Sequence, residues 1–432
     1  MFLAFLLLAN WAKQSTGVVE LPKGSIAVSA EIRLPDGAHD LELRGSQTIL
    51  RAADNFQGRA ILSCTHCRNL KIIGLTLEGN RDRIAKPAGL PPSDRSFAQF
   101  TISNGILIEQ ADGLAITGAN FQHIAGFAVL VSASRHVTIE KLTVNASGSL
   151  NDKRRNNTTG GILMEEGTTD FTVRQCALTD IRGNGIWTHS LYRSPRNQDG
   201  RITENTFSGI GRDAIQIGHA TRMSVENNKG SRIGYPVEIT DVENRATPVA
   251  IDTAGNVDSS LYANNTFEEI DGKCIDLDGF HDGSVNHNSC TNRQPAETYP
   301  WGHFAIVMNN TNPDMQSRNI TISGNIISGT KFGGIFVIGE GNTIARNHMV
   351  NLNRAHCNET HAKFGCLSFA DEPDILRSGI YLGRRAERPA LARHNTIIDN
   401  QMEGFGMKDH CIGFAPGVKP QEQKISGNAC KE

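Results

Sequence analysis

The chain has 432 residues, of which 20% are charged and 6% are aromatic, and its formal net charge is −2 at pH 7. This balance excludes a broad basic surface, so we expect no nucleic-acid partner. Beyond the N-terminus no apolar run is long enough for a bilayer, so we also expect no membrane span. Short apolar segments separated by Gly and Asn favour an all-β protein over a helical one.

The chain opens on an apolar run over residues 2–9, followed by Asn10, Trp11 and Lys13. The run is too short for a transmembrane helix and is typical of the core of a signal peptide. We therefore predict a signal peptide over residues 1–17, a β domain over residues 18–432, and a secreted or periplasmic protein. No Lys or Arg precedes the run, so a truncated or misassigned start is the alternative.

Eight of the nine cysteines form four pairs that are close in sequence: Cys64 with Cys67, Cys274 with Cys290, Cys357 with Cys366, and Cys411 with Cys430. Such pairs suit local disulfides of a secreted protein and leave Cys176 alone. Two alternatives stay open. Several of these cysteines are equally compatible with free thiols stacked inside a β solenoid. The segment Cys64-Thr65-His66-Cys67 is also compatible with a zinc or redox half-site, although no second half-site follows at zinc spacing.

One phrase recurs along the chain: a small residue, then Ile, any residue, and an apolar residue. Its copies begin their apolar part at Ile106, Ile162, Ile186, Ile215, Ile251, Ile275, Ile306, Ile335 and Ile380. The shortest spacings, about 22 to 29 residues, are those of one coil of a parallel β-helix. We predict a solenoid of roughly 11 coils.

A second phrase lies between these copies, an apolar alternation that runs into Asn, as in Ile320-Thr321-Ile322-Ser323-Gly324-Asn325. Alternation with a period of two indicates a strand with one buried face. Because Asn tolerates left-handed backbone geometry and bonds to its own chain, stacked Asn residues suit a repeated tight turn.

These phrases, together with Val19-Glu20-Leu21-Pro22-Lys23-Gly24 and the segment over residues 70–77, resemble the pectin-lyase-like superfamily of right-handed parallel β-helices. The resemblance covers nearly the whole mature chain. It implies an all-β, single-domain solenoid and a role among polysaccharide lyases, glycoside hydrolases, polyuronate epimerases or phage tailspikes. Fold alone does not choose among these activities.

Insertions break the coil length at the edges of the repeated Ile strands. Those that precede a strand are residues 81–103, 149–159, 231–248, 291–303 and 353–378, and those that follow one are residues 191–200 and 310–318. Equivalent positions stack in a solenoid, so these loops are expected to flank one face, and such insertions commonly map to the binding side.

Side chains alternate across a strand, so if the repeated Ile is inside, the next residue faces outward. The middle coils then present Asp252, Asp276 and Asp278 on one face. Asp252 and Asp276 are expected on adjacent coils, about 4.8 Å apart, and Asp276 and Asp278 are about 6.5 Å apart along one strand. Crowded carboxylates raise each other's pKa unless a cation is present.

Two chemistries use such a cluster. In glycoside hydrolysis one Asp donates a proton to the glycosidic oxygen while another activates water. Alternatively the three carboxylates bind Ca²⁺, which neutralises a uronate so that a base removes the α-proton; His189, Arg212 and Lys273 are the nearby candidates. The structural alternative is that each Asp caps a turn.

Further candidates for substrate binding are outward-facing or flank the same strands: Trp187, His189, Gln216, Arg212, Lys273 and Asn309. An exposed Trp187 suits stacking against a sugar ring, and its alternative is packing beneath the loop at residues 191–200. Polygalacturonase-like members carry Asn-Thr-Asp, Asp-Asp, Gly-His-Gly and Arg-Ile-Lys signatures that this chain does not match, and it also lacks the Asp-Pro-His-Asp of alginate epimerases.

We therefore expect an extracellular polysaccharide-degrading enzyme, most simply a glycoside hydrolase with Asp252, Asp276 and Asp278 as its carboxylate centre and no cofactor. The alternatives are a Ca²⁺-dependent polyuronate lyase or epimerase and a non-catalytic glycan-binding adhesion solenoid. The expected partner is a polysaccharide, and we expect a monomer.

Overall fold

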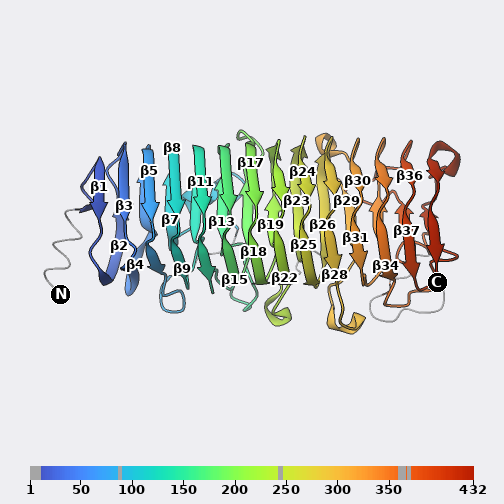
Figure 1. The fold of residues 1–432 in the computed structure, drawn as a ribbon, viewed down its shortest axis with the longest axis horizontal. Coiled ribbons are helices and arrows are strands. Elements are labelled where there is room, and N and C mark those ends of the chain that lie inside the picture. Colours follow the sequence, from blue (N-terminus) through green and yellow to red (C-terminus); the bar gives the residue numbers. More distant parts are fainter. Residues whose placement is uncertain (1–10, 86–89, 242–246, 359–365, 367–370) are drawn as a thin grey trace. The chain divides into compact units, whose positions relative to one another are not determined.

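The computed structural model describes residues 11–85, 90–241, 247–358, 366 and 371–432. Almost all regular structure in it is parallel β-strand (Figure 1), which confirms the predicted β solenoid. The chain divides into two compact units, one ending at Arg212 and including Glu238–Asp241, the other covering the rest of the chain from Asp213 to Glu432. No helix in the described residues is long and apolar enough to cross a membrane. The predicted signal peptide falls largely outside the described residues, which begin at Trp11.

Three ladders of parallel strands build the first unit. Ladder 1 contains β1 (Gly17–Glu20), β3 (Leu41–Arg44), β5 (Arg68–Ile73), β8 (Asp112–Thr117), β11 (Arg135–Glu140), β14 (Thr169–Arg174) and β17 (Asn197–Thr203). Ladder 2 contains β2 (Gly24–Arg33), β4 (Thr48–Thr65), β6 (Thr76–Glu78), β9 (Asn120–Gln122), β12 (Thr143–Asn145), β15 (Ala177–Ile181) and β18 (Thr206–Ile210). Ladder 3 continues from the end of β4 through β7 (Asn104–Glu109), β10 (Val129–Ser132), β13 (Ile162–Glu165) and β16 (Ile186–His189).

The second unit repeats the plan. Ladder 1 contains β21 (Ser224–Glu226), β24 (Leu261–Ala263), β27 (Ser284–Asn286), β30 (Thr321–Ser323), β33 (Thr343–Ala345), β36 (Thr396–Ile398) and β39 (Lys424–Ser426). Ladder 2 contains β22 (Lys229–Ile233), β25 (Thr266–Ile270), β28 (Ser289–Thr291), β31 (Ile326–Ser328), β34 (His348–Leu352), β37 (Gln401–Gly404) and β40 (Ala429–Lys431). Ladder 3 contains β19 (Ile215–Ile217), β23 (Val249–Asp258), β26 (Lys273–His281), β29 (Ile306–Asn309), β32 (Ile335–Val337), β35 (Ile380–Leu382) and β38 (Ile412–Phe414), and the short β20 (Ala220–Thr221) also pairs with β23.

Ladder 1 has seven described strands in each unit, which is more coils than the roughly eleven predicted. The reason is that several coils do not carry the Ile phrase. The strands before Asn104 lack it, and Val129 takes the place of Ile in β10. A repeat search that follows Ile alone therefore misses the coils in which another apolar residue fills the same buried position.

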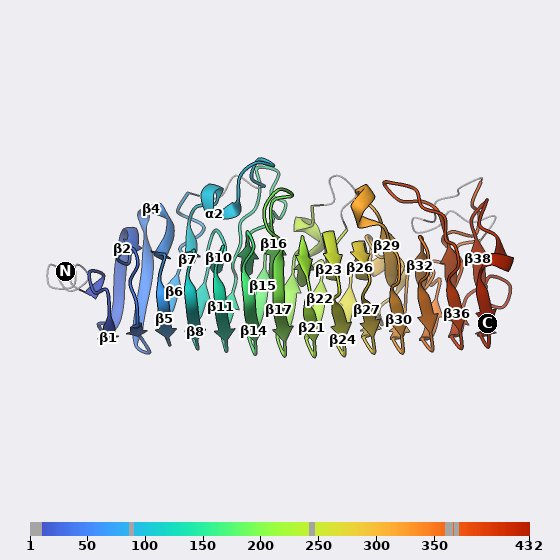
Figure 2. The same ribbon diagram turned by 90° about the horizontal axis from the view of Figure 1, so that it is seen from above.

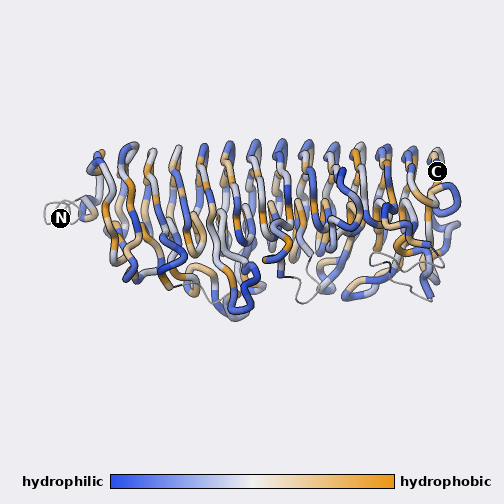
Figure 3. The backbone as a smooth tube through the Cα atoms, turned by 90° about the horizontal axis from the view of Figure 1, so that it is seen from below, coloured by the Kyte–Doolittle hydropathy of each residue, from blue (hydrophilic) through white to orange (hydrophobic). Residues whose placement is uncertain are grey.

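The repeated Ile side chains stack inside the coils, as predicted. In the second unit Ile215, Ile251 and Ile275 stand opposite one another in successive strands and are completely buried. In the first unit Ile106, Val129, Ile162 and Ile186 form the same kind of column. Apolar and polar segments accordingly alternate along each coil (Figure 3), and this alternation fixes which side chains face outward.

The small residue before the Ile is required by the closeness of the coils. A Cβ atom on Gly161 would lie 1.7 Å from the carbonyl oxygen of Gly185 in the next coil, and one on Gly105 would lie 2.4 Å from the oxygen of Ala128. Both distances are far inside van der Waals contact, so the backbone alone fits at these corners.

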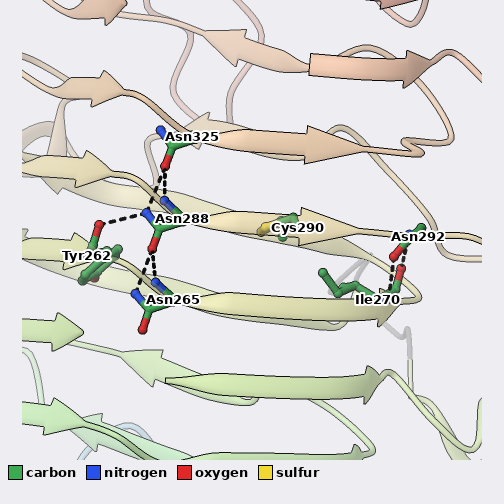
Figure 4. The surroundings of a disulfide bond; sticks show 8 residues. Tyr262, Asn265, Ile270, Asn288, Cys290, Asn292 and Asn325 are labelled. Atoms are coloured by element: carbon green, nitrogen blue, oxygen red, sulfur yellow. Dashed lines mark hydrogen bonds between the residues drawn. A yellow bond between two sulfur atoms is a disulfide. The ribbon is translucent and has the colours of Figure 1, made fainter. Parts of the chain in front are cut away.

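A column of buried Asn side chains joins the coils of the second unit at the corner between ladders 1 and 2. The Oδ1 atom of each Asn accepts the backbone N–H of the Asn in the preceding coil at 2.9–3.1 Å, through Asn228, Asn265, Asn288, Asn325, Asn347, Asn400 and Asn428 (Figure 4). The left-handed backbone position predicted for Asn belongs instead to the residue before it, for example Asn264 (φ 56°) or His287 (φ 55°). The stacked Asn supplies the hydrogen bonds of the turn, and its predecessor supplies the bend.

All four predicted cysteine pairs are disulfides, and Cys176 is a buried free thiol. The Cys64–Cys67 bond leaves no pair of free thiolates for the zinc half-site. The Cys274–Cys290 bond links the start of β26 to β28 within one coil. Each bond is local, so the disulfides reinforce individual coils.

The insertions leave the coils mainly between ladders 2 and 3. In the first unit the segment after β6 carries α2 (Phe97–Phe100), which lies over the strands of ladder 3 (Figure 2). Short 3₁₀ helices occupy other connections: η1 (Val237–Ile239), η3 (Ala296–Thr298), η4 (Pro313–Met315) and η6 (Pro420–Glu422). The insertion predicted over residues 191–200 is shorter, because β17 already begins at Asn197.

Replacing Asn288 by Ala should lower the free energy of unfolding by about 2–4 kcal/mol, because it leaves several buried backbone and side-chain groups without partners. The groups concerned include the Tyr262 carbonyl and the Asn265 N–H. Urea unfolding followed by circular dichroism measures the effect. The control is Asn286→Ala, which removes a half-buried side chain that accepts one hydroxyl bond from Ser323. Equal losses for the two variants would contradict this role of the column.

Candidate functional site

The three predicted aspartates come together on ladder 3 of the second unit. Asp252 on β23 stands directly opposite Asp276 on β26, and Asp278 follows two residues along the same strand. All three point away from the interior, because Ile251, Ile275 and Leu277 between them are completely buried in it. The predicted register is therefore correct, and neighbouring Cα atoms in the ladder are about 4.8 Å apart.

The carboxylates are nevertheless well covered. Asp252 is 9% exposed and Asp276 is 7% exposed, whereas Asp278 is half-buried and lies nearer the surface. The sequence argument expected an open groove floor at all three positions. Lys273 contacts Asp276 and Gln216 donates to Asp252, so both side chains lie against the row, which a strand pattern alone does not reveal.

Lys273 and Asp276 form a buried ion pair at the centre of the row. The Lys273 ammonium donates to Oδ2 of Asp276, three residues along the strand, and the lysine side chain is 17% exposed. Burial alone would lower the pKa of Lys273, but the carboxylates of Asp276, Asp252 and Asp278 raise it above its ordinary value. The pair keeps one positive and one negative charge together in a region of low polarity.

Asp252 lies on β23, the strand that precedes the strand of Asp276 in the ladder. Oδ2 of Asp252 accepts a hydrogen bond from Nε2 of Gln216 at 2.9 Å, and Gln216 is its neighbour in the ladder. Burial, together with the negative charges of Asp213 and Asp276, raises the pKa of Asp252 well above its ordinary value. A proton on Asp252 relieves the repulsion between its carboxyl group and that of Asp276, its neighbour in the ladder.

Asp278 has a different environment at the outer end. Oδ2 of Asp278 accepts a hydrogen bond from the hydroxyl of Thr311 at 2.7 Å. Burial raises the pKa of Asp278 to about 6, the Thr311 bond partly offsets this, and the charges of Asp276 and Glu387 add to it. Asp278 is thus a carboxyl group that gains and loses its proton within the weakly acidic range.

Two oxygen atoms of the cluster are buried without a hydrogen-bond partner among the described residues. They are Oδ1 of Asp276 and Oδ1 of Asp278. A buried acceptor without a partner costs about 1–3 kcal/mol, so such groups are typically satisfied by a proton, water, an ion or a ligand. The arrangement therefore supplies one charged and one titrating carboxyl group, each with an acceptor atom to spare.

A metal ion at this cluster would need ligand atoms that converge. Within the described residues, the one set of three such side chains whose ligand atoms all lie within 4.8 Å of one another is Glu165, Glu166 and His189 in the first unit. Asp252, Asp276 and Asp278 do not form such a set, and the Lys273 ammonium sits against Asp276. Three carboxylates are suitable ligands for Ca²⁺, but a Ca²⁺ site here would require Lys273 to move.

The other predicted residues of the second unit join the row as supporting groups. Gln216 is bound to Asp252, and Lys273 to Asp276. Asn309 stands opposite Asp278 in the ladder, and its Oδ1 accepts the backbone N–H of Glu387 at 3.2 Å. Asn309 therefore holds the segment over residues 384–392 beside the outer carboxyl group.

Trp187, His189 and Arg212 belong to the first unit. Trp187 is 6% exposed and packs edge-on against Phe97 at 4.9 Å between ring centres, so the predicted open stacking surface is wrong. Its hydrophobic cluster also contains Phe127, Leu130, Leu163 and Ala98. The cover comes from α2 rather than from the loop after β16, because the insertion over residues 81–103 folds back onto ladder 3.

His189 and Arg212 are half-buried in the first unit. His189 contacts the Phe97 and Trp187 rings and lies 4.0 Å from Glu165. Arg212 follows β18 and its backbone N–H bonds to the oxygen of Gly183.

Glu165 is the most deeply buried carboxyl group of the first unit's ladder 3. Its two oxygens accept the backbone N–H groups of Phe97 and Ala98 at 2.9 and 2.6 Å, so this side chain fastens α2 to β13. Burial raises the pKa of Glu165 to about 8, even though the two N–H groups lower it.

Sequence reasoning missed Asp213 and Thr311, which complete the surroundings of the cluster. Asp213 accepts the backbone N–H of Val249 at 3.0 Å and raises the pKa of Asp252. It occupies the corner position two residues before Ile215, where Asn104 and Asn184 stand in two coils of the first unit, and a carboxylate at this corner was an available signal. Thr311 lies in an insertion, whose fold the repeat does not determine.

Replacing Lys273 by Met should lower the free energy of unfolding at pH 7 by about 3–5 kcal/mol, because it leaves the buried Asp276 carboxylate without its cation. The double variant Lys273→Met/Asp276→Leu should regain most of that loss, since an apolar pair replaces the ions. Urea unfolding measures both, with the exposed Lys229→Met as control. An equal loss in the single and double variants would show that the ion pair is not the cause.

The raised pKa of Asp278 predicts a pH-dependent stability. Because the folded protein holds this proton up to about pH 6 while the ordinary pKa is 3.8, the favourable contribution is complete below about pH 4 and is lost as the pH rises through 6. Asp278→Asn should therefore gain about 1–3 kcal/mol relative to the wild type between pH 4 and pH 7. Unfolding at both pH values tests this, with the exposed Asp409→Asn as control; a constant difference would contradict it.

Comparison with known proteins places the fold. The family model described as "right handed beta helix region" matches residues 60–229 and 194–351, together about two thirds of the chain. No curated protein matches the sequence significantly.

Several solved structures are similar. One is DFA-IIIase from Arthrobacter chlorophenolicus A6, with 12% sequence identity and a TM-score of 0.55 over 95% of this chain and 88% of that one. Another is the tailspike protein of E. coli bacteriophage HK620 in complex with a pentasaccharide, with 11% identity and a TM-score of 0.57 over 96% of this chain and 74% of that one. A third is PfbA, a surface adhesin of Streptococcus pneumoniae, with 14% identity and a TM-score of 0.53 over 78% of this chain and 82% of that one. At these identities the likeness concerns the fold alone. The chain belongs to the right-handed β-helix family.

Proposed function

We propose that this protein is an extracellular glycoside hydrolase that binds a polysaccharide over ladder 3 of the second unit and cleaves it at Asp276 and Asp278. A related fold accommodates a pentasaccharide in the HK620 tailspike and an adhesive role in PfbA, which supports a glycan partner. The four local disulfides and the apolar N-terminal run support secretion or export to the periplasm. We expect the protein to act as a monomer.

The observation that carries the proposal is the contrast between two neighbouring carboxyl groups. Asp276 is held against the Lys273 ammonium as its anionic partner, whereas the pKa of Asp278 is raised to about 6 by burial. Glycoside hydrolysis requires this division, one carboxyl group to deliver a proton and one carboxylate to accept a proton or attack.

The roles follow from the two environments. Asp278, nearer the surface, would donate its proton to the glycosidic oxygen and so assist departure of the leaving sugar. Asp276 would take a proton from the attacking water. Two residues along a strand span about 6.5 Å between Cα atoms, compatible with the about 6.5–9.5 Å between carboxyl groups of inverting enzymes. Asp252, held by Gln216 and disposed to keep its proton, would limit the negative charge beside Asp276.

The Ca²⁺-dependent polyuronate lyase or epimerase is the alternative within the enzymes. It draws support from the unpartnered Oδ1 atoms of Asp276 and Asp278. The position of Lys273 against Asp276 favours hydrolysis, because its ammonium already supplies the positive charge that Ca²⁺ would bring. Hydrolysis also needs no separate base for an α-proton.

A non-catalytic glycan-binding solenoid is the second candidate, and the burial of the cluster favours it. With Asp252 and Asp276 at 9% and 7% exposure, a polymer would reach Asp278 first and Asp276 only after side chains on the rim move. In that case the row would be a structural charge network, and glycans would bind outside it.

Incubation with neutral and acidic polysaccharides, with and without EDTA, separates the three functions. New reducing ends without ultraviolet absorbance support hydrolysis, and absorbance of an unsaturated uronate that EDTA abolishes supports the lyase. Epimerisation changes only the NMR spectrum of the polymer. Retention on a polysaccharide without any chemical change supports the binding solenoid.

Asp278→Asn and Asp276→Asn should each lower kcat for the cleaved polymer by about 10²–10⁴-fold, the usual contribution of a positioned acid or base. In the wild type kcat should fall as the pH rises above about 6, because Asp278 then loses the proton it donates. Reducing-end assays between pH 4 and pH 8 measure both effects, with Asp409→Asn as control. Wild-type rates in both variants would rule out this site.

A further inference from the structure

A hollow lies in the second unit, away from the carboxylate row. It has a volume of about 390 Å³ and opens at the ends of β34 and β37, beside η3. Its lining contains Glu297, Asn351, Arg354, His356 and Phe405, with Pro295 and backbone of the same turns. The volume is within the about 300–1,000 Å³ that is usual for small-molecule sites.

Two rings form one wall of this hollow. His356 and Phe405 are stacked, with 4.4 Å between ring centres and 14° between ring planes. His356 is exposed and Phe405 is half-buried. These rings belong to different coils, so their alignment depends on the turns that carry them.

The turns are tied together by a buried side chain. Asn353 donates from Nδ2 to the carbonyl oxygens of Cys357 and Phe405 at 3.0 and 3.2 Å, and its Oδ1 accepts the Cys357 N–H at 2.9 Å. Cys357 is also bonded to Cys366. The ring pair is therefore held in place before any ligand arrives, which reduces the entropy lost on binding.

Polar groups of both signs surround the rings. Arg354 donates from its guanidinium to the carbonyl oxygen of Asn292 at 3.1 Å, which fixes its planar head at the rim. Glu297 on η3 and Asn351 at the end of β34 are exposed on the lining. A stacking surface flanked by amide, carboxylate and guanidinium groups matches a sugar ring, whose C–H faces are apolar and whose edge carries hydroxyls.

The hollow lies at the corner between ladders 2 and 3 of the second unit. Residues 353–379 connect β34 to β35 and residues 292–305 connect β28 to β29, so both connections pass from ladder 2 to ladder 3. From β26, which carries Asp276, to β35 there are three steps of the ladder, or about 14 Å. A polymer of a few sugar units lying along the ladder spans such a distance.

We propose that the hollow lined by His356, Phe405, Arg354 and Glu297 is a saccharide-binding subsite that holds the polymer several units away from the bond to be cleaved. The proposal rests on the proposed glycan partner, but it does not require that Asp276 and Asp278 be catalytic. The subsite contributes binding to long chains and leaves the chemical step unchanged.

The test uses the full chain and linear hexasaccharides and trisaccharides of glucose, xylose, mannose, galactose and N-acetylglucosamine. Titration calorimetry is done on the Asp276→Asn/Asp278→Asn variant so that no sugar is consumed. With Phe405→Ala added, binding of the preferred hexasaccharide should weaken at least tenfold and binding of the trisaccharide should change less than twofold. His356→Ala, at an exposed position, should weaken hexasaccharide binding several-fold. Tyr192→Ala, an exposed aromatic of the first unit, is the matched control.

The outcomes separate the two proposals. If the cleaved polymer shows a higher KM and an unchanged kcat in His356→Ala and Phe405→Ala, both stand. If hexasaccharides bind through Phe405 and His356 but no polymer is cleaved, the hydrolase proposal fails and the subsite stands. Wild-type hexasaccharide affinity in both ring variants, or no binding of any of the ten sugars, overturns the subsite.

Discussion

The constraint on which this molecule depends is the parallel register of its coils. Each residue of a ladder has the equivalent residue of the next coil about 4.8 Å away. Side chains at equivalent positions therefore contact one another, and a residue type that recurs there must pack favourably against a second copy of itself. Apolar side chains and Asn amides meet this condition well. The column from Asn228 to Asn428 shows the amide case, because each side chain presents an acceptor to one neighbouring coil and a donor to the other.

Charged groups meet the same condition only with help, and this explains the chemistry of the carboxylate row. Asp252 and Asp276 are direct neighbours in a ladder, where two anions repel each other strongly in a poorly hydrated environment. The chain resolves the conflict in two ways, with the Lys273 ammonium at Asp276 and with protons on Asp252 and, in weak acid, on Asp278. Burial raises the pKa of both Asp252 and Asp278, and for Asp252 the stacking of a like residue on the repeated backbone adds to it.

The sequence predicted those features that the repeat controls. The buried Ile columns and the outward row from Gln216 to Asp276 follow from spacing and alternation. The spacing of the cysteines indicated the four local pairs but left free thiols equally open. Features made by the insertions were not predictable in this way. Trp187 occupies the expected outward position, but α2 covers it, because the folding of residues 81–103 onto ladder 3 leaves no periodic signal. The burial of Asp252 and the role of Thr311 were missed for the same reason: they depend on contacts between side chains and loops, which have no counterpart from coil to coil.

The fastening of α2 by Glu165 has a consequence for proteolysis. A protease needs several residues of extended, detached backbone, and loop tips usually supply it. The insertion that carries α2 is pinned by the backbone N–H groups of Phe97 and Ala98, which donate to Glu165, and both residues are 1% exposed, so this part of the insertion offers no such stretch. The exposed turn at Lys153, Arg154 and Arg155 in the same unit has three basic residues in succession and no comparable anchor in the hydrophobic cluster. A protease of broad specificity would therefore cut the turn at Lys153–Arg155 before it cut the pinned segment around Phe97 and Ala98.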